Sequence, residues 1–260
     1  MGPSGVKAIK EKLPNIIKEK KVDFVILNGE NAANNGAGIS KQNLEDFFNA
    51  GTDVITSGNH IWDQKETMEI IAKEKRLLRP ENSIKPAPGN GFGIFDTKNK
   101  KKIAVVNLMG NIFMKKSDDV FEAAKKFINT VQLKKDADFI VVDMHGEITS
   151  EKMAMGYFFD GKATVVIGTH THVPTSDHRI MDKGTAYQTD IGMCGDYNSV
   201  IGMNRENSLK KFFKDNSAKK HFPSLGEATI SGLLVTADEV TGLAKKIQPI
   251  ILGGALQERV

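Results

Sequence analysis

Short runs of apolar residues alternate with segments of helical periodicity along most of the chain. The runs lack strict alternation of apolar and polar positions, which is typical of strands buried on both faces of a sheet. They predict strands over residues 22–27, 53–56, 102–107, 138–142, 163–167 and 186–189. Near the end of the chain, residues 229–235 and 247–251 are also predicted as strands, with no helix between them.

Capping residues and the spacing of apolar positions predict helices between these strands. One helix is expected from a Ser4 cap to Lys20, kinked or restarted at Pro14. A second covers residues 41–49 and begins after Ser40, whose hydroxyl can cap it.

Two further helices are expected, one from Asp63 to about Lys75 and one from Ser117 towards Val131. Prolines and glycines mark residues 86–93 as a loop. The alternation of strands and helices predicts an α/β fold. Because no repeat or linker interrupts it, a single domain over residues 1–260 is expected.

The composition is that of a soluble globular protein. The chain has 260 residues, of which 40% are hydrophobic and 26% are charged, and these values argue against a disordered or collagen-like chain. The net charge is +4, and the pairs and triplets of lysine are scattered along the sequence. Direct nucleic-acid binding is therefore not indicated.

The sequence favours a cytoplasmic protein. Its one cysteine, Cys194, excludes an intramolecular disulfide and suits a reducing compartment. No run approaches the roughly 18 apolar residues that cross a bilayer, so no membrane partner is expected. The first residues also lack the apolar core of a signal peptide.

Polar residues that can bind metal follow at least four of the predicted strands. His60, His145, His170 and His172 all stand at such strand ends, where open α/β sheets bind their ligands. In an extended segment the spacing of His170 and His172 puts both imidazoles on one side. Imidazole is a common metal ligand, so we expect a metal site at this edge of the fold.

Four motifs occur in a specific order along the chain. They are Gly29-Glu30-Asn31, Gly58-Asn59-His60, Asp143-Met144-His145 and Gly168-Thr169-His170-Thr171-His172. This ordered set resembles the YmdB-type branch of the calcineurin-like metallophosphoesterases. The resemblance implies a sandwich of two mixed β-sheets flanked by helices. It also implies that the chain is a hydrolase that cleaves phosphodiesters, cyclic nucleotides included, with two metal ions.

The resemblance assigns a role to each motif residue. Glu30 would bridge the two ions, with Asn59, His145 and His170 on one ion and Asn31 and His172 on the other. A hydroxide between the ions would attack phosphorus. His60 would be the general acid that protonates the leaving oxygen. The family favours iron or manganese, and the mixture of nitrogen and oxygen ligands also suits zinc or nickel.

The chain departs from the family pattern in three places. The family begins with a short strand ending in Gly-Asp, whose Asp is a further metal ligand, and Met1 aligns just after it, so we expect this chain to lack that segment. Gly146 replaces a usual Ala. Asn111 stands where an Arg near the substrate is common, and Asn cannot offer its charged bidentate fork.

The most specific expectation is hydrolysis of a small-molecule phosphodiester, with 2′,3′-cyclic nucleotides giving 3′-nucleotides. Two alternatives stay open. A nucleotide phosphomonoesterase would use the same dimetal chemistry with a different pocket. A regulator that binds a nucleotide or RNA without hydrolysing it would follow if the ion served by the missing Asp were lost. Formation of a homo-oligomer is also left open.

Overall fold

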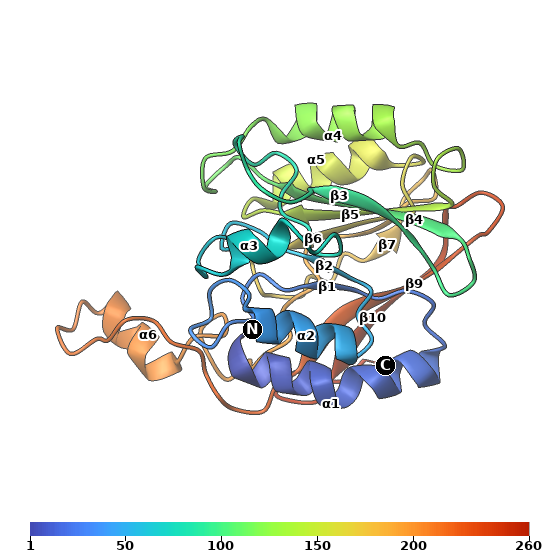
Figure 1. Cartoon of the computed structure of the whole chain (residues 1–260). Helices are drawn as coiled ribbons and strands as arrows, with labels where there is room; N and C mark the ends of the chain where they lie inside the picture. Colours follow the sequence, from blue (N-terminus) through green and yellow to red (C-terminus); the bar gives the residue numbers. More distant parts are fainter. Residues whose placement is uncertain (260) are drawn as a thin grey trace.

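The computed structural model describes residues 1–259 and shows four layers (Figure 1). Helices α4 (Val120–Thr130) and α5 (Thr149–Phe159) cover one face of a six-stranded sheet. The opposite side of the molecule holds two pairs of strands, covered by α1 (Gly2–Lys20) and α2 (Lys41–Asn49). This arrangement confirms the predicted α/β sandwich with sheets flanked by helices.

The large sheet is mixed and has the strand order β3-β4-β5-β6-β8-β7. Strands β4, β5, β6 and β8 run parallel, and β3 and β7 pair antiparallel at the two edges. Its strands are β3 (Phe92–Asp96), β4 (Lys102–Met109), β5 (Phe139–His145), β6 (Val165–Thr169), β7 (Arg179–Ile180) and β8 (Ala186–Gln188). The other layer has a parallel pair, β1 (Ile26–Asn28) with β2 (Val54–Thr56), and an antiparallel pair, β9 (Ile230–Ala237) with β10 (Ala244–Leu252).

Three predicted helix starts differ from the observed ones. Helix α1 begins at Gly2, so Ser4 lies inside it, and its hydroxyl donates to the Ser224 carbonyl instead of capping. The helix expected from Asp63 to about Lys75 is shorter, α3 (Thr67–Ile71), and the Asp63 carboxylate contacts the His60 imidazole instead of capping the helix. Helix α4 is capped by Asp119 and not by Ser117. The Ser40 cap of α2 is confirmed, since its hydroxyl accepts from the Asn43 N–H.

Several elements were not predicted, among them β3, α5, β7 and α6 (Arg205–Phe212). Strand β3 occupies part of the region expected to be a loop. Helix α5 buries the charged residues Glu151 and Lys152 together with apolar ones, so its sequence has no clear apolar stripe.

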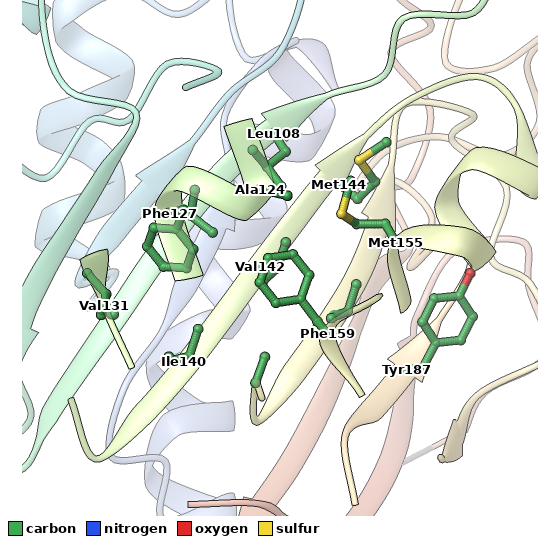
Figure 2. Close-up of a cluster of buried hydrophobic side chains, with 14 of the residues drawn as sticks. Leu108, Ala124, Phe127, Val131, Ile140, Val142, Met144, Met155, Phe159 and Tyr187 are labelled. Carbon is green, nitrogen blue, oxygen red and sulfur yellow. The ribbon is translucent and has the colours of Figure 1, made fainter. Parts of the chain in front are cut away.

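The core is divided among the layers by the alternation of side chains along β4 and β5. Ala104, Val106 and Leu108 of β4 pack towards α4 and α5, in the cluster shown in Figure 2. Ile103 and Val105 point the other way and pack with Val54 and Leu78 between the sheets. Both faces of these strands are therefore buried, which is why their sequences are nearly continuous apolar runs.

A cavity of about 680 Å³ lies between β1 and β9. Among residues 1–259, β1 pairs only with β2 and β9 only with β10, so each strand has a free edge. The lining extends to Glu30, Asn31, His170 and His172. The cavity thus connects the interior of the fold with the predicted metal ligands. None of the described helices combines the length and apolar character needed to cross a membrane.

Replacing Ile140 by Ala should lower the free energy of unfolding by about 2–5 kcal/mol, because Ile140 is fully buried and its removal leaves a cavity. Ile94→Ala in β3 is the matched control, since Ile94 is 44% exposed. Its cost should stay below about 1 kcal/mol. Urea unfolding measures both, and equal losses would contradict the assignment of the core.

Candidate metal centre

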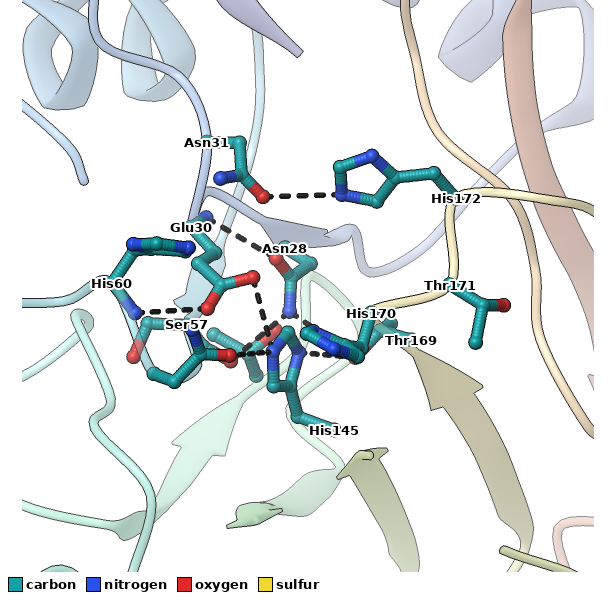
Figure 3. Close-up of polar contacts among 12 residues, drawn as sticks. Asn28, Glu30, Asn31, Ser57, His60, His145, Thr169, His170, Thr171 and His172 are labelled. Carbon is teal, nitrogen blue, oxygen red and sulfur yellow. Dashed lines mark hydrogen bonds and ion pairs between the residues drawn. The ribbon is translucent and has the colours of Figure 1, made fainter. Parts of the chain in front are cut away.

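The predicted ligands come together at the carboxyl ends of parallel strands from both layers (Figure 3). Glu30 and Asn31 follow β1, and Asn59 follows β2. His145 is the last residue of β5, and His170 comes directly after β6. The parallel direction of these strands explains why motifs far apart in the sequence meet at one edge.

The first group of side chains surrounds the His145 imidazole. Its Nε2 lies 3.0 Å from Glu30 Oε2 and 3.1 Å from Asn59 Oδ1. Ligand atoms of Glu30, His145 and His170 all lie within 4.8 Å of one another. Glu30 and His145 are almost completely buried. Buried carboxylate, amide and imidazole groups that converge in this way have the chemistry of a metal site.

The second group pairs Asn31 with His172. His172 Nδ1 donates to the Ile201 carbonyl at 2.8 Å, which leaves Nε2 as an acceptor in the neutral ring. Asn31 Nδ2 donates to the Gly36 carbonyl, so its Oδ1 faces that Nε2 at 3.2 Å. Burial lowers the pKa of His172, which favours the neutral ring. Two acceptors therefore face each other, and a cation between them would satisfy both.

A buried carboxylate beneath the site orients His145. Asp143 accepts from Asn28 Nδ2 at 3.0 Å, from Thr56 Oγ1 at 2.6 Å and from Thr169 Oγ1 at 2.7 Å. Because the Thr169 hydroxyl donates its proton to Asp143, it must accept from His145 Nδ1 at 2.9 Å. The other ring nitrogen, Nε2, is thereby directed at Glu30. Such partners behind a ligand fix its tautomer and orientation.

The charges in the first group are strongly coupled. Burial raises the pKa of Glu30, but the charge of His145 and hydrogen bonds to His145 and the His60 N–H outweigh it and bring the pKa to about 2. Burial lowers the pKa of His145, yet the Glu30 carboxylate raises it above its usual value. His170 shows the opposite balance, since burial and the nearby His145 lower its pKa to about 4. Of these two imidazoles, His145 therefore holds a proton more readily than His170.

His60 stands beside this group without joining it. Its backbone N–H donates to Glu30 Oε1 at 2.9 Å, and its side-chain Nδ1 lies 2.6 Å from Asp63 Oδ2. Lys115 Nζ contacts both the Asn59 carbonyl, at 2.8 Å, and Asp63. The Asp63 carboxylate thus orients the imidazole, and Nε2 is left free of the contacts described. The sequence offered a signal for this role of Asp63, which follows His60 by three residues, but its pattern favoured a helix cap.

The loop with His170 and His172 has an unusual backbone. Both histidines have positive φ angles, 100° and 66°, a region that favours glycine. Thr171 between them donates its N–H and its hydroxyl to Asp190 Oδ2. Asp190 in turn pairs with Lys152 Nζ at 2.8 Å, and both side chains are only 1% exposed. This buried ion pair holds the loop in the conformation that presents both imidazoles.

Four further positions are relevant to the site. A Cβ on Gly58 would lie 2.2 Å from His145 Nε2, so only glycine fits there. Glu147 Oε2 lies 3.2 Å from His170 Nε2, a contact that the sequence did not predict.

Asn111 caps the start of α4, because its Oδ1 accepts from the Val120 N–H. A Cβ on Gly146 would make only ordinary contacts, so the usual Ala would also fit.

The comparisons with known proteins agree with this arrangement. A model of the YmdB-like protein family matches residues 1–250. The chain belongs to this family. A 2′,3′-cyclic-nucleotide 2′-phosphodiesterase of Bacillus subtilis (strain 168) is 40% identical over 252 residues, covering 97% of this chain and 94% of that protein.

Two solved structures resemble the fold closely. A novel phosphatase from Mycoplasma pneumoniae has a TM-score of 0.88 and 37% identity, covering 97% of this chain and 90% of that one. A hypothetical protein from Thermus thermophilus also has a TM-score of 0.88, with 36% identity and coverage of 97% and 95%. The YmdB-like chain is a phosphoesterase with the calcineurin-like fold, as its motifs predicted.

Metal affinity should fall as the pH is lowered from 8 to 6. The pKa of His145 lies above its usual value, so binding must displace its proton, whereas His170 with a pKa of about 4 is already neutral. Below the pKa of His145, affinity should drop by up to about tenfold per pH unit. Titration calorimetry with Mn²⁺ measures this. Constant affinity across that range would show that His145 is not a ligand.

Replacing Lys152 by Met should lower the free energy of unfolding by about 3–5 kcal/mol, because it leaves the buried Asp190 carboxylate unpaired. The double variant K152M/D190N should recover part of this loss, since no buried charge remains. Urea unfolding compares the two variants. If the single variant were as stable as the wild type, the buried ion pair would not support the loop.

Proposed function

We propose that this chain is a metal-dependent phosphodiesterase that converts 2′,3′-cyclic nucleotides to 3′-nucleotides. The observation that carries the proposal is the facing pair of acceptors at Asn31 and His172, next to the cluster around His145. The name of the Bacillus subtilis relative supports the same substrate class.

Six residues would hold two ions. Asn59, His145 and His170 would serve one ion, Asn31 and His172 the other, and the Glu30 carboxylate has two oxygens with which to bridge them. When bound, the ions would supply positive charge to the phosphate and activate water. We assign them as iron or manganese on the family resemblance, and elemental analysis of the purified protein separates these from zinc or nickel.

His60 is proposed as the general acid. Its imidazole lies beside Glu30 and is oriented by Asp63, so its free Nε2 can donate a proton to the leaving oxygen. In the reaction the oxygen of water forms a new bond to phosphorus, and the bond from phosphorus to O2′ breaks. O2′ takes the proton of His60 and becomes a hydroxyl, the attacking water releases a proton that returns to His60 through solvent, and the phosphate stays on O3′. An alkoxide is a poor leaving group, so this proton transfer is worth a large factor in rate.

Two alternatives give different results in simple assays. A phosphomonoesterase would hydrolyse p-nitrophenyl phosphate faster than bis-p-nitrophenyl phosphate, and we expect the reverse. A regulator without catalysis would bind a nucleotide tightly and show no metal-dependent hydrolysis.

Replacing His60 by Ala should leave both metals bound and reduce turnover of a 2′,3′-cyclic nucleotide by roughly 10²–10⁴-fold, the usual contribution of a general acid. Lys126→Ala is the control, since Lys126 is exposed on α4 and is not among the proposed ligands. Metal content and product formation are measured on the same samples. Unchanged turnover in the His60 variant would remove His60 from the mechanism, and loss of metal would make it a ligand.

A further inference from the structure

A hairpin that contains α6 projects from the body of the molecule, as the orange segment in Figure 1 shows. We call residues 204–223 the arm. The two ends of the arm are joined by a hydrogen bond from the Asn204 N–H to the Phe222 carbonyl. Asn207 ties its middle together, because its Oδ1 accepts from the Lys219 N–H at 2.7 Å. The arm is therefore an ordered element with its own internal contacts.

The segment that leads into the arm contacts the candidate metal centre. Ile201, three residues before the arm, accepts from His172 Nδ1 at 2.8 Å. The other side of the site has a comparable loop over residues 110–117, in which Lys115 Nζ contacts the Asn59 carbonyl. His172 and His60 lie at opposite ends of the group of ligands in Figure 3. The arm therefore begins close to His172, and the 110–117 loop contacts the segment that carries Asn59.

The arm carries the net charge of the whole chain. It holds six basic and two acidic residues, whereas the other 240 residues hold 30 of each sign. Its five lysines are all exposed, and within residues 1–259 none of them forms an ion pair. They are Lys210, Lys211, Lys214, Lys219 and Lys220. Unpaired charge of one sign near a site attracts ligands of the opposite sign.

Exposed aromatic rings lie among these lysines. Phe212 and Phe213 are 77% and 82% exposed, and Phe113 in the loop across the site is 86% exposed. Large exposed apolar side chains that lie together, as the adjacent Phe212 and Phe213 do, are typical of binding surfaces. Rings interleaved with lysines fit a single-stranded nucleic acid, whose bases stack on the rings while its phosphates meet the ammonium groups. A second copy of this chain fits less well, because it would bring an arm of the same positive charge.

We propose that the arm and the 110–117 loop bind single-stranded RNA and present its terminal 2′,3′-cyclic phosphate to the metal centre. This inference rests on the proposed function and narrows the substrate from a free nucleotide to the end of a strand. RNA is required, because a 2′,3′-cyclic phosphate needs the 2′ oxygen of ribose. The nucleotides upstream of the end would supply binding energy that a cyclic mononucleotide lacks.

The test compares two substrates with the same terminal base: a cyclic mononucleotide and an eight-residue RNA that ends in a 2′,3′-cyclic phosphate. We expect kcat/KM to be at least about tenfold higher for the RNA, since stacking one base is worth about that factor. K210E/K211E should remove most of this advantage. It should also reduce the slope of log(kcat/KM) against log[salt] by about 1.4, given about 0.7 for each contact with a single-strand phosphate.

Two further variants complete the test. F212S/F213S should cost about tenfold or more on the RNA. K125E/K126E is the matched control, because it reverses two adjacent exposed lysines on α4, which lies on the far side of the large sheet from α1 and α2. K125E/K126E should leave kcat/KM unchanged for both the RNA and the cyclic mononucleotide. All three variants should hydrolyse the cyclic mononucleotide at the wild-type rate.

Equal kcat/KM for the two substrates, or equal losses in K210E/K211E and K125E/K126E, would overturn the inference. An F212S/F213S variant that is monomeric in light scattering, where the wild type is an oligomer, and that hydrolyses RNA at an unchanged rate would also overturn it, since the arm would then join two copies.

Fluorescence anisotropy with an RNA ending in 3′-phosphate measures binding without hydrolysis. If the wild type bound this RNA through the arm but failed to hydrolyse either substrate, the proposed function would fail and the role of the arm would stand.

Discussion

The buried carboxylate of Asp143 is the contact on which the rest of the site depends. It receives hydrogen bonds from Asn28 of β1, Thr56 of β2 and Thr169 of β6, so it joins the two strand layers beneath the ligands. An unpaired charge at this depth would cost several kcal/mol, and the three donors reduce that cost. Burial still raises the pKa of Asp143, which shows that desolvation outweighs these contacts.

Asp143 positions two candidate ligands, His145 and Glu30, each through one intermediate residue. The Thr169 hydroxyl donates to Asp143 and therefore accepts from His145 Nδ1. This leaves His145 Nε2 directed at Glu30. Asn28 donates to Asp143 with its amide nitrogen and accepts from the Glu30 N–H with its oxygen. A single buried group therefore positions two candidate ligands from different strands. The loop of His170 and His172 has a separate support in the Lys152–Asp190 pair.

Much of the fold and of the candidate site was predictable, because both depend on signals that are local in sequence. Apolar runs marked most strands of the sheets, and polar residues at their ends marked the six ligand candidates. Helix α5 escaped prediction because Glu151 and Lys152 lie on its buried face, where charge usually indicates solvent. Asp190 acts through Thr171 and Lys152, which only the tertiary structure brings near, so its position in the sequence alone could not reveal its role. The arm was missed for another reason, since its charge is conspicuous only when the balance of the other 240 residues is counted.

Gly58 limits which substitutions the candidate site can accept. A Cβ there would collide with His145 Nε2 and with Glu30 Oε1, both of which belong to the same cluster. Any larger residue would have to push two ligand candidates apart at once. A relative that keeps every ligand candidate but carries a side chain at this position must have rebuilt the pocket around it. Inspection of this one glycine thus separates chains that inherited the intact geometry from chains that retain only its residues.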